Sequence, residues 1–204
     1  MIMKRQQNKT SFITGEGIAD RIFLTYLKDL YTERSIGHRI TVHQASNPNI
    51  SGGSSKTVMR NALLSCCKSS AFDAVVVLLD SDIMTVPCCE LYSTAKRTVN
   101  KQKRHMIPSS YACIMANPCL EGLLLEALTG KTPPQHSREC KHLFITNFGK
   151  EAHRLTSNDY YRFLPKEKLD QASYKVPALN RLISFFKLSG NDDRFTSWFA
   201  QQVS

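Results

Sequence analysis

Hydrophobic and polar positions along the first two thirds of the chain predict four strands separated by helices. Short apolar or β-branched runs place the strands at residues 11–14, 39–43, 74–79 and 111–115. Apolar residues at spacings of three and four place helices at residues 18–30, 56–67, 88–102 and 119–128. The third strand, AVVVLL, is apolar throughout, as expected of a central parallel strand covered on both faces.

This alternation predicts an α/β fold with a mostly parallel four-stranded sheet flanked by helices. After Thr129 the pattern changes: residues 130–142 are expected to form a polar connection, and the rest is expected to be mainly helical. We therefore expect a core over residues 1–130 and a helical extension over 131–204 that completes the same domain. A chain of 204 residues is long enough to bury one such core.

The chain carries a formal net charge of +10, which favours an anionic partner such as nucleic acid without proving one. The best candidates for phosphate contacts are basic residues in and after the helix at 88–102, and a merely solvated helix face is the alternative. They are Lys96, Arg97, Lys101, Lys103 and Arg104. No apolar run approaches the ~20 residues of a membrane span, and the N-terminus lacks the apolar segment of a signal peptide. A cytoplasmic protein is expected.

The seven cysteines contain no Cys-x-x-Cys spacing, which argues against a zinc knuckle. An odd count without a secretion signal predicts reduced thiols, most of them acting as small core hydrophobes.

Acidic residues follow the predicted strands where a parallel sheet binds its ligands. Glu16 follows the first strand, and Asp80 and Asp82 follow the third. Asp20 lies one helical turn after Glu16, and Glu121 lies inside the helix after the fourth strand. Such a cluster would repel itself without a cation, and Mg²⁺ prefers carboxylate oxygens. Helix capping and ordinary turns are the alternatives for each motif taken alone.

Three motifs in this order resemble the Toprim domain of topoisomerases, primases and nucleases of the overcoming-lysogenization-defect type. They are TGEGIAD after the first strand, VVVLLDSD at the third and ANPCLEGLLLEAL after the fourth. The chain is more similar still to RloB-like Toprim proteins, which are associated with bacterial anti-phage defence. In these, Asn-Pro-Cys, an apolar residue and Glu precede an apolar helix, as at residues 117–121. The resemblance spans about residues 11–128, with a weaker match at 174–175.

The resemblance implies a site that holds Mg²⁺ or Mn²⁺. Its metal ligands would be Glu16, Asp20, Asp80, Asp82 and Glu121, and its catalytic residues Glu16, Asp80, Asp82, Glu121 and Lys175. Glu16 would handle protons, and Lys175 would steady the phosphate in the transition state. Lys141 and Lys150 remain alternatives for this basic residue. The tryptophan that relatives often carry near Glu121 is replaced by Gly122 and Leu123.

The implied activity is a metal-dependent endonuclease that favours RNA, including tRNA, over DNA. It would be the toxic effector of a defence system, controlled by a separate ATPase. The alternative is a catalytically inactive Toprim-fold subunit that binds nucleic acid or another protein. Strand passage and primer synthesis are disfavoured, because the chain carries neither a tyrosine-bearing cleavage domain nor a zinc ribbon. Self-association stays open.

Other motifs are weaker. Residues 52–57 (GGSSKT) resemble a phosphate-binding loop but lack the glycine before the lysine, so a lead-in to a helix is favoured. His142 and His153 are conceivable proton shuttles, with surface or capping roles favoured. The aromatic residues of the last third are expected in the core rather than as base-stacking platforms.

Overall fold

The structure is a computed structural model of the chain. It describes residues 8–32, 37–43, 54–69, 72–84, 86–102, 107–190 and 193–203. The side chains at 68, 69, 101, 102, 202 and 203 lie outside this description.

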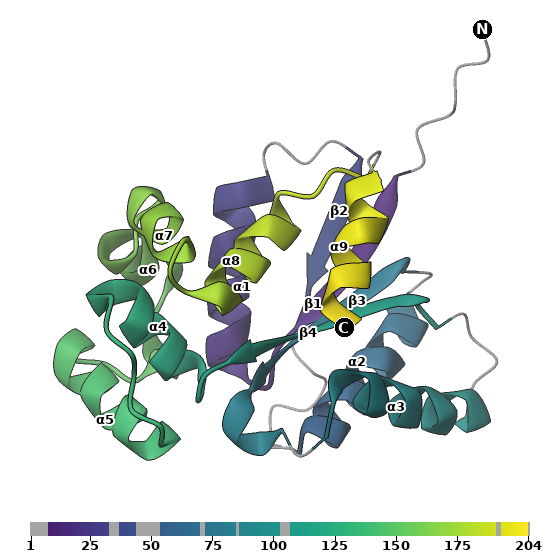
Figure 1. Cartoon of the computed structure of the whole chain (residues 1–204), viewed down its shortest axis with the longest axis horizontal. Coiled ribbons are helices and arrows are strands. Elements are labelled where there is room, and N and C mark those ends of the chain that lie inside the picture. Colours follow the sequence, from purple (N-terminus) through teal and green to yellow (C-terminus); the bar gives the residue numbers. More distant parts are fainter. Residues whose placement is uncertain are drawn as a thin grey trace, which may run out of the picture.

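The centre of the molecule is a sheet of four parallel strands in the order β2-β1-β3-β4. The strands are β1 (Lys9–Thr14), β2 (His38–Val42), β3 (Ala74–Asp80) and β4 (Ser110–Ala116). Thr14 lies opposite Val77, and Asp80 lies opposite Ala116. The predicted α/β class with a parallel four-stranded sheet flanked by helices is therefore confirmed, and the sheet of the described residues is wholly parallel (Figure 1).

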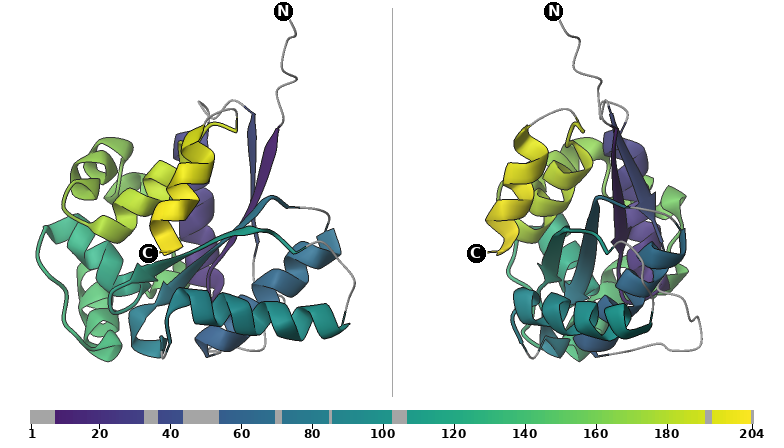
Figure 2. Two further views of the ribbon diagram at one scale, coloured as in Figure 1. Left: turned by 45° about the vertical axis from the view of Figure 1, so that its right-hand side comes forward. Right: turned by 90° about the vertical axis from the view of Figure 1, so that its right-hand side faces the viewer.

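Helices cover both faces of the sheet. Those of the first part are α1 (Ile18–Tyr31), α2 (Ser55–Ser69), α3 (Cys88–Gln102) and α4 (Leu120–Thr129). Those of the second part are α5 (Ser137–Phe148), α6 (Ser157–Phe163), α7 (Lys166–Ser173), α8 (Pro177–Phe186) and α9 (Asp193–Val203). The short 3-10 helices η2 (Ser81–Ile83) and η3 (Ala152–Arg154) connect longer elements. Figure 2 shows α2 and α3 together on one side of the sheet and α8 and α9 on the other.

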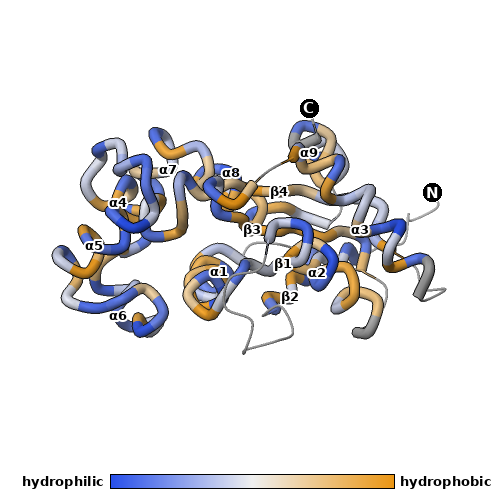
Figure 3. Tube along the Cα trace, turned by 90° about the horizontal axis from the view of Figure 1, so that it is seen from below, coloured by the Kyte–Doolittle hydropathy of each residue, from blue (hydrophilic) through white to orange (hydrophobic). Residues whose placement is uncertain are grey.

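The alternating side chains of β3 separate two hydrophobic cores. Val75, Val77 and Leu79 join the core formed with α2 and α3. Val76 and Leu78 join the larger core formed with α1, α4 and the C-terminal helices. Both faces of β3 are thus buried, which explains its continuous apolar sequence; Figure 3 shows hydrophobic residues along β3 and β4.

The C-terminal helices pack against the larger core. The predicted helical character of this region is confirmed, and most of its aromatic residues are core residues as expected. Tyr161 is an exception, being 46% exposed. One prediction was wrong: residues 137–142 belong to α5 and not to a polar connection. Only Cys140 and Phe144 of α5 are buried, so its apolar stripe is too narrow to dominate the sequence pattern.

The prediction that all cysteines are reduced was also wrong. Cys88, the first residue of α3, forms a disulfide with Cys113 of β4, with a Cα–Cα distance of 5.9 Å. These residues are 25 positions apart, and strand pairing and helix packing bring them together, which spacing alone does not reveal. Four of the other five cysteines are buried, as expected of small core hydrophobes; Cys89 is exposed.

In the part of the chain that is described, none of the helices combines the length and the apolarity that crossing a membrane requires.

Candidate active site

Glu16 and Asp80 lie at the topological switch point of the sheet, between β1 and β3. The neighbouring strands β1 and β3 are followed by connections that lead outward in opposite directions, to β2 and to β4. At such a point, the carboxyl ends of the strands leave room for a ligand. The Asp80 backbone N–H donates a hydrogen bond to Glu16 Oε1 over 2.8 Å, so the two predicted site residues are in direct contact.

Asp20 lies behind this pair in the first turn of α1. Its side chain is 6% exposed, and its Oδ2 accepts a hydrogen bond of 2.8 Å from the Gly17 backbone N–H. Gly15 makes room for it, since a Cβ at Gly15 would lie 2.2 Å from the Asp20 Cβ. The Gly-Glu-Gly turn therefore accommodates the buried Asp20 and leaves Glu16 half-buried beside it.

The segment after β4 brings in the other two carboxylates. Asp80 Oδ1 accepts a hydrogen bond of 3.1 Å from the Leu120 backbone N–H, so Asp80 caps α4, where Glu121 occupies the first turn. The Asp82 backbone N–H donates to the Pro118 carbonyl over 3.3 Å. Asp80 therefore caps a helix, as the alternative interpretation expected, and also belongs to the carboxylate cluster.

Gly122 lets the start of α4 pack closely against the Asn117-Pro118 segment. A Cβ at this position would lie 2.6 Å from the Asn117 carbonyl oxygen and 2.7 Å from Pro118 Cδ. In this chain, a tryptophan has no room there. The departure from the resemblance at residue 122 thus has a steric reason.

The electrostatics show that the five carboxylates influence one another. The pKa of Asp80 rises to about 8, first because of burial and then because of the charges of the other four carboxylates. The pKa of Glu16 rises to about 7, because burial and the repulsion from Asp20 and Asp82 outweigh the hydrogen bond from the Asp80 backbone, which lowers it. The pKa of Asp20 rises to about 6, from burial first and from Glu121 second among the raising causes. A bound cation would relieve this repulsion, and raised carboxyl pKa values of this kind are common at functional sites.

Helix α5 supplies two groups to the site. The Ser137 hydroxyl donates a hydrogen bond to Asp82 Oδ2. The charge of Lys141, one helical turn further, lowers the pKa of Glu16 as the smallest of the causes that act on it, and no described hydrogen bond or ion pair joins the two residues. Sequence reasoning missed Ser137, because its segment was expected to be a connection. The signal was faint: Cys140, Phe144 and Phe148 recur at a spacing of four along the buried side of this helix, and Phe148 is only partly buried.

Lys175 stays a prediction for the basic catalytic residue, and Lys141, which the sequence left as an alternative, acts on Glu16 through its charge. Lys175 lies exposed between α7 and α8, and no described hydrogen bond or ion pair joins it to the five carboxylates. Lys150, the other alternative, pairs with Asp159 over 3.0 Å. Of the histidines, His142 is exposed, and His153 lies 3.4 Å from Glu151.

The carboxylates do not form a ready-made metal site. Among the described residues, no three His, Cys, Asp or Glu side chains are arranged to hold a metal ion. Four of the five carboxylates already accept a hydrogen bond from the protein, from the backbone of Gly17, Asp80 or Leu120 or from the Ser137 hydroxyl. The donor set fits a hard divalent cation in its chemistry, since it is all oxygen and its repulsion would be relieved by one. The metal stays a prediction.

The basic residues predicted to contact nucleic acid lie partly outside the described side chains. Lys96 lies over the Tyr92 ring at 5.8 Å, and Arg97 donates to the Thr94 hydroxyl over 3.4 Å. Lys103 and Arg104 lie outside the described residues, as does the side chain of Lys101. Gly52 and Gly53 of the glycine-rich motif are also outside, while Ser54 precedes α2 and its carbonyl accepts from the Thr57 N–H over 2.8 Å.

Comparisons with known proteins leave the family open. No protein-family model matches the chain, and neither a curated protein nor a solved structure resembles it closely enough to count as a match. The geometry of the carboxylates and Lys141 therefore carries the functional argument, and the resemblance to Toprim proteins stays a prediction from the three motifs.

Proposed function

We propose that this protein is a divalent-metal-dependent endonuclease of the Toprim type. One observation carries the proposal: the five predicted carboxylates act on one another's ionisation at the carboxyl ends of neighbouring parallel strands, where the charge of Lys141 also acts on Glu16. The chain as a whole carries a net charge of +10. A phosphodiester is the substrate class that combines attraction to a basic protein with a need for an acidic metal site.

The residues would act together as follows. Asp80, Asp82 and Glu121 would hold Mg²⁺ or Mn²⁺, and Glu16 and Asp20 would complete the acidic cluster. A bound cation supplies an activated water and stabilises the charge that develops on phosphate oxygens. Lys141 would bind a non-bridging phosphate oxygen as a point charge. Ser137 would orient Asp82 through the hydrogen bond that its hydroxyl already donates.

The substrate proposal favours RNA, including tRNA, over DNA, because the RloB-like resemblance points that way. The same resemblance supports the role of toxic effector in anti-phage defence, a cytoplasmic location and control by a separate ATPase. Lys96 and Arg97 on α3 would contact phosphates along a bound strand.

A second candidate is a catalytically inactive subunit that binds nucleic acid. It is favoured by the absence, among the described residues, of three groups positioned to hold a metal. The two candidates differ in one measurable property, which is divalent-metal binding at the acidic cluster.

The test combines metal binding with cleavage. The purified protein is titrated calorimetrically with Mg²⁺ and Mn²⁺, and is separately incubated with total RNA and plasmid DNA with each metal or with EDTA. We expect metal binding and metal-dependent loss of RNA. Asp80→Ala with Asp82→Ala should reduce cleavage by about 100-fold or more.

Asp29→Asn is the matched control, because Asp29 is an exposed carboxylate of α1 outside the cluster. It should cleave and bind metal like the wild type. Nucleic-acid binding without any metal binding would instead establish the inactive subunit.

A further inference from the structure

One buried tyrosine hydroxyl has no hydrogen-bond partner in the part of the chain that is described. Tyr160, on α6, is 1% exposed, and its hydroxyl oxygen meets neither a donor nor an acceptor among the described residues. Leaving a buried hydroxyl unpaired costs free energy, so such groups are rare and each one calls for a physical reason. A phenylalanine would fill the same space without this cost.

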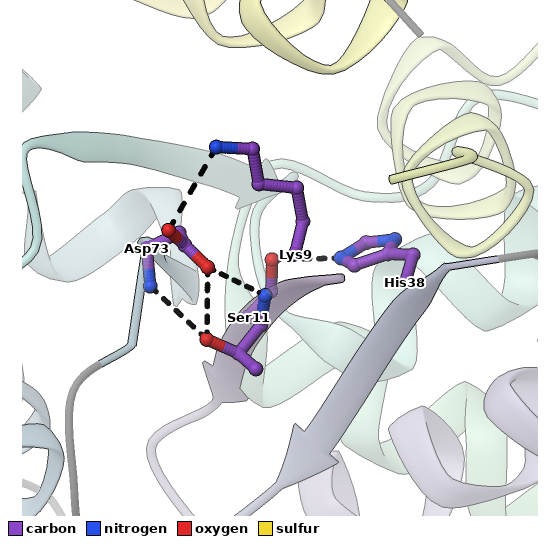
Figure 4. A network of polar contacts seen from close by, with 5 residues as sticks. Lys9, Ser11, His38 and Asp73 are labelled. Carbon is purple, nitrogen blue, oxygen red and sulfur yellow. Dashed lines mark hydrogen bonds and ion pairs between the residues drawn. The ribbon is translucent and has the colours of Figure 1, made fainter. Parts of the chain in front are cut away.

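Buried polar side chains are paired at the opposite end of the sheet. His38 Nδ1 lies 3.1 Å from the Leu188 carbonyl oxygen, and His38 Nε2 lies 2.8 Å from the Ser11 hydroxyl oxygen. Figure 4 shows this histidine and serine beside the ion pair of Lys9 and Asp73. The polar groups of this network satisfy one another, which is the ordinary arrangement in a protein interior.

Two other buried side-chain atoms lack a partner among the described residues, His43 Nδ1 and Ser55 Oγ. Both lie within two positions of residues 44–53, which the structure does not describe, so their chain neighbours are incomplete. Tyr160 lies well inside the continuous described range 107–190. Its unpaired hydroxyl therefore needs another explanation.

The packing of Tyr160 places it beside the acidic cluster. Asp20, Phe23 and Tyr26 follow one another at spacings of three and therefore lie along one side of α1. The Tyr160 ring packs against Phe23 and Tyr26, at centroid distances of 5.5 and 5.3 Å. Tyr160 thus covers the side of α1 that carries the buried carboxylate of Asp20 in its first turn.

Two carboxylates of the cluster act on the Tyr160 hydroxyl and still have oxygens that can accept a hydrogen bond. Burial is the largest cause of the raised pKa of Tyr160, and the charges of Asp20 and Glu121 are the next two. Asp20 Oδ2 accepts from the Gly17 N–H, whereas no described hydrogen bond reaches Asp20 Oδ1 or either oxygen of Glu121. A protonated phenol supplies the donor that these acceptors lack.

We propose that Tyr160 is a positioning residue of the acidic cluster, whose hydroxyl donates a hydrogen bond to the Asp20 side of the cluster when the carboxylates hold a divalent cation. The inference rests on the proposed metal site and adds to it a residue of α6 that is not itself a ligand. Carboxylates that bind metals are usually held in orientation by such hydrogen bonds. This bond would give the hydroxyl the partner that the other described residues do not supply.

Tyr160→Phe tests the proposal, because it removes the hydroxyl and keeps the ring. Mn²⁺ is titrated calorimetrically into the full chain after treatment with EDTA and dialysis. The affinity for Mn²⁺ should fall by about 10- to 100-fold, as is usual when a hydrogen bond to a ligand is lost. The melting temperature in EDTA should stay the same or rise, because the hydroxyl has no hydrogen bond to lose.

Tyr26→Phe is the matched control. The Tyr26 hydroxyl donates to the Leu164 carbonyl oxygen, and its ring stacks on Tyr160 with 19° between the ring planes. Removing this paired hydroxyl should lower the melting temperature. The affinity for Mn²⁺ should stay within about twofold of the wild type, because the hydroxyl of Tyr26 is bonded to α6 and not to the cluster. The two neighbouring tyrosines should therefore give opposite results.

Two results would overturn the role of Tyr160 alone. One is a wild-type affinity for Mn²⁺ in Tyr160→Phe, and the other is a loss of melting temperature in EDTA as large as that of Tyr26→Phe, which would mean that the hydroxyl is already paired. A wild-type protein that does not bind Mn²⁺ would overturn the proposed function and this inference together. Mn²⁺ binding that Tyr160→Phe weakens, without cleavage of RNA or DNA, would support this inference and overturn only the nuclease proposal.

Discussion

The Asp80 backbone N–H donates to the Glu16 carboxylate over 2.8 Å, which ties the carboxyl ends of β3 and β1 together at the acidic cluster. Both side chains are partly withdrawn from water, and burial is the first cause of the raised pKa of each. Burial therefore makes the ionisation of both carboxyl groups oppose folding, although the hydrogen bond itself favours the ionised form of Glu16.

This arrangement predicts that the metal-free protein loses stability as the pH rises. The pKa values of about 7 for Glu16 and about 8 for Asp80 lie above their ordinary values of 4.5 and 3.8. The folded protein therefore binds more protons than the unfolded chain. The stabilising contribution is complete below about pH 4 and is lost as the pH rises through 7 and 8.

Thermal denaturation in EDTA at pH 5.5 and pH 8 measures this effect against Asp80→Asn, which keeps an oxygen for the Leu120 N–H but does not ionise. The melting temperature of the wild type should fall relative to that of the variant at pH 8. Mg²⁺ should restore it at pH 8 more than at pH 5.5, because protons compete with the cation. A difference between the two proteins that does not change with pH would contradict the raised pKa values.

Gly15 and Gly17 should respond differently to alanine, although they flank the same glutamate. A Cβ at Gly15 would lie 2.2 Å from the Asp20 Cβ, whereas one at Gly17 would meet only Asp20 Oδ2 at 3.9 Å. Gly15→Ala should therefore lower the free energy of unfolding by about 1–3 kcal/mol. Gly17→Ala should cost less than about 1 kcal/mol. Urea denaturation of both variants checks this, and equal losses would mean that Asp20 is not packed against Gly15.

The fold and the positions of Glu16 and Asp80 were predictable because they depend on local patterns in the sequence. The alternation of strands and helices predicts the sheet, and the ends of β1 and β3 place Glu16 and Asp80 at its carboxyl edge. The contributions of Ser137 and Lys141 were not predictable in the same way. They depend on how a mostly exposed helix packs more than 50 residues after Asp82, and no local pattern encodes that packing.

The disulfide between Cys88 and Cys113 should contribute measurably to stability. It closes a loop over a sequence separation of 25 residues, for which loop-closure entropy alone corresponds to about 3 kcal/mol. Cys113→Ser should lower the free energy of unfolding by about this amount, and dithiothreitol should do the same to the wild type. Cys89→Ser is the control, because Cys89 is exposed and unbonded, and it should change stability by less than about 0.5 kcal/mol. An unchanged urea midpoint after reduction would contradict the bond.

The basic residues of α3 should govern the salt dependence of nucleic-acid binding. If Lys96 and Arg97 each contact a phosphate, replacing both with glutamine should reduce the slope of log affinity against log salt by about 2. Arg181→Gln, on the other side of the sheet, should leave the slope unchanged. Fluorescence anisotropy with a labelled RNA at several salt concentrations measures both slopes. Equal slopes for the wild type and the double variant would assign α3 to a solvated surface.

The last prediction concerns the lysine of the acidic cluster. Lys141 lowers the pKa of Glu16 through its charge, and Lys175 lies between α7 and α8; both lysines are exposed. If the protein is a nuclease, Lys141→Ala should slow cleavage by about 100-fold, the usual effect of removing one group that stabilises transition-state charge. Lys175→Ala should keep near-normal activity.

The comparison is informative because both lysines are exposed and neither substitution empties the core. Single-turnover cleavage rates at saturating Mg²⁺ isolate the chemical step from substrate binding. Lys141→Arg keeps the positive charge and should recover part of the lost rate. If Lys175→Ala is the inactive variant instead, the phosphate would bind on the side of α7 and α8. Lys141 would then have no role in catalysis.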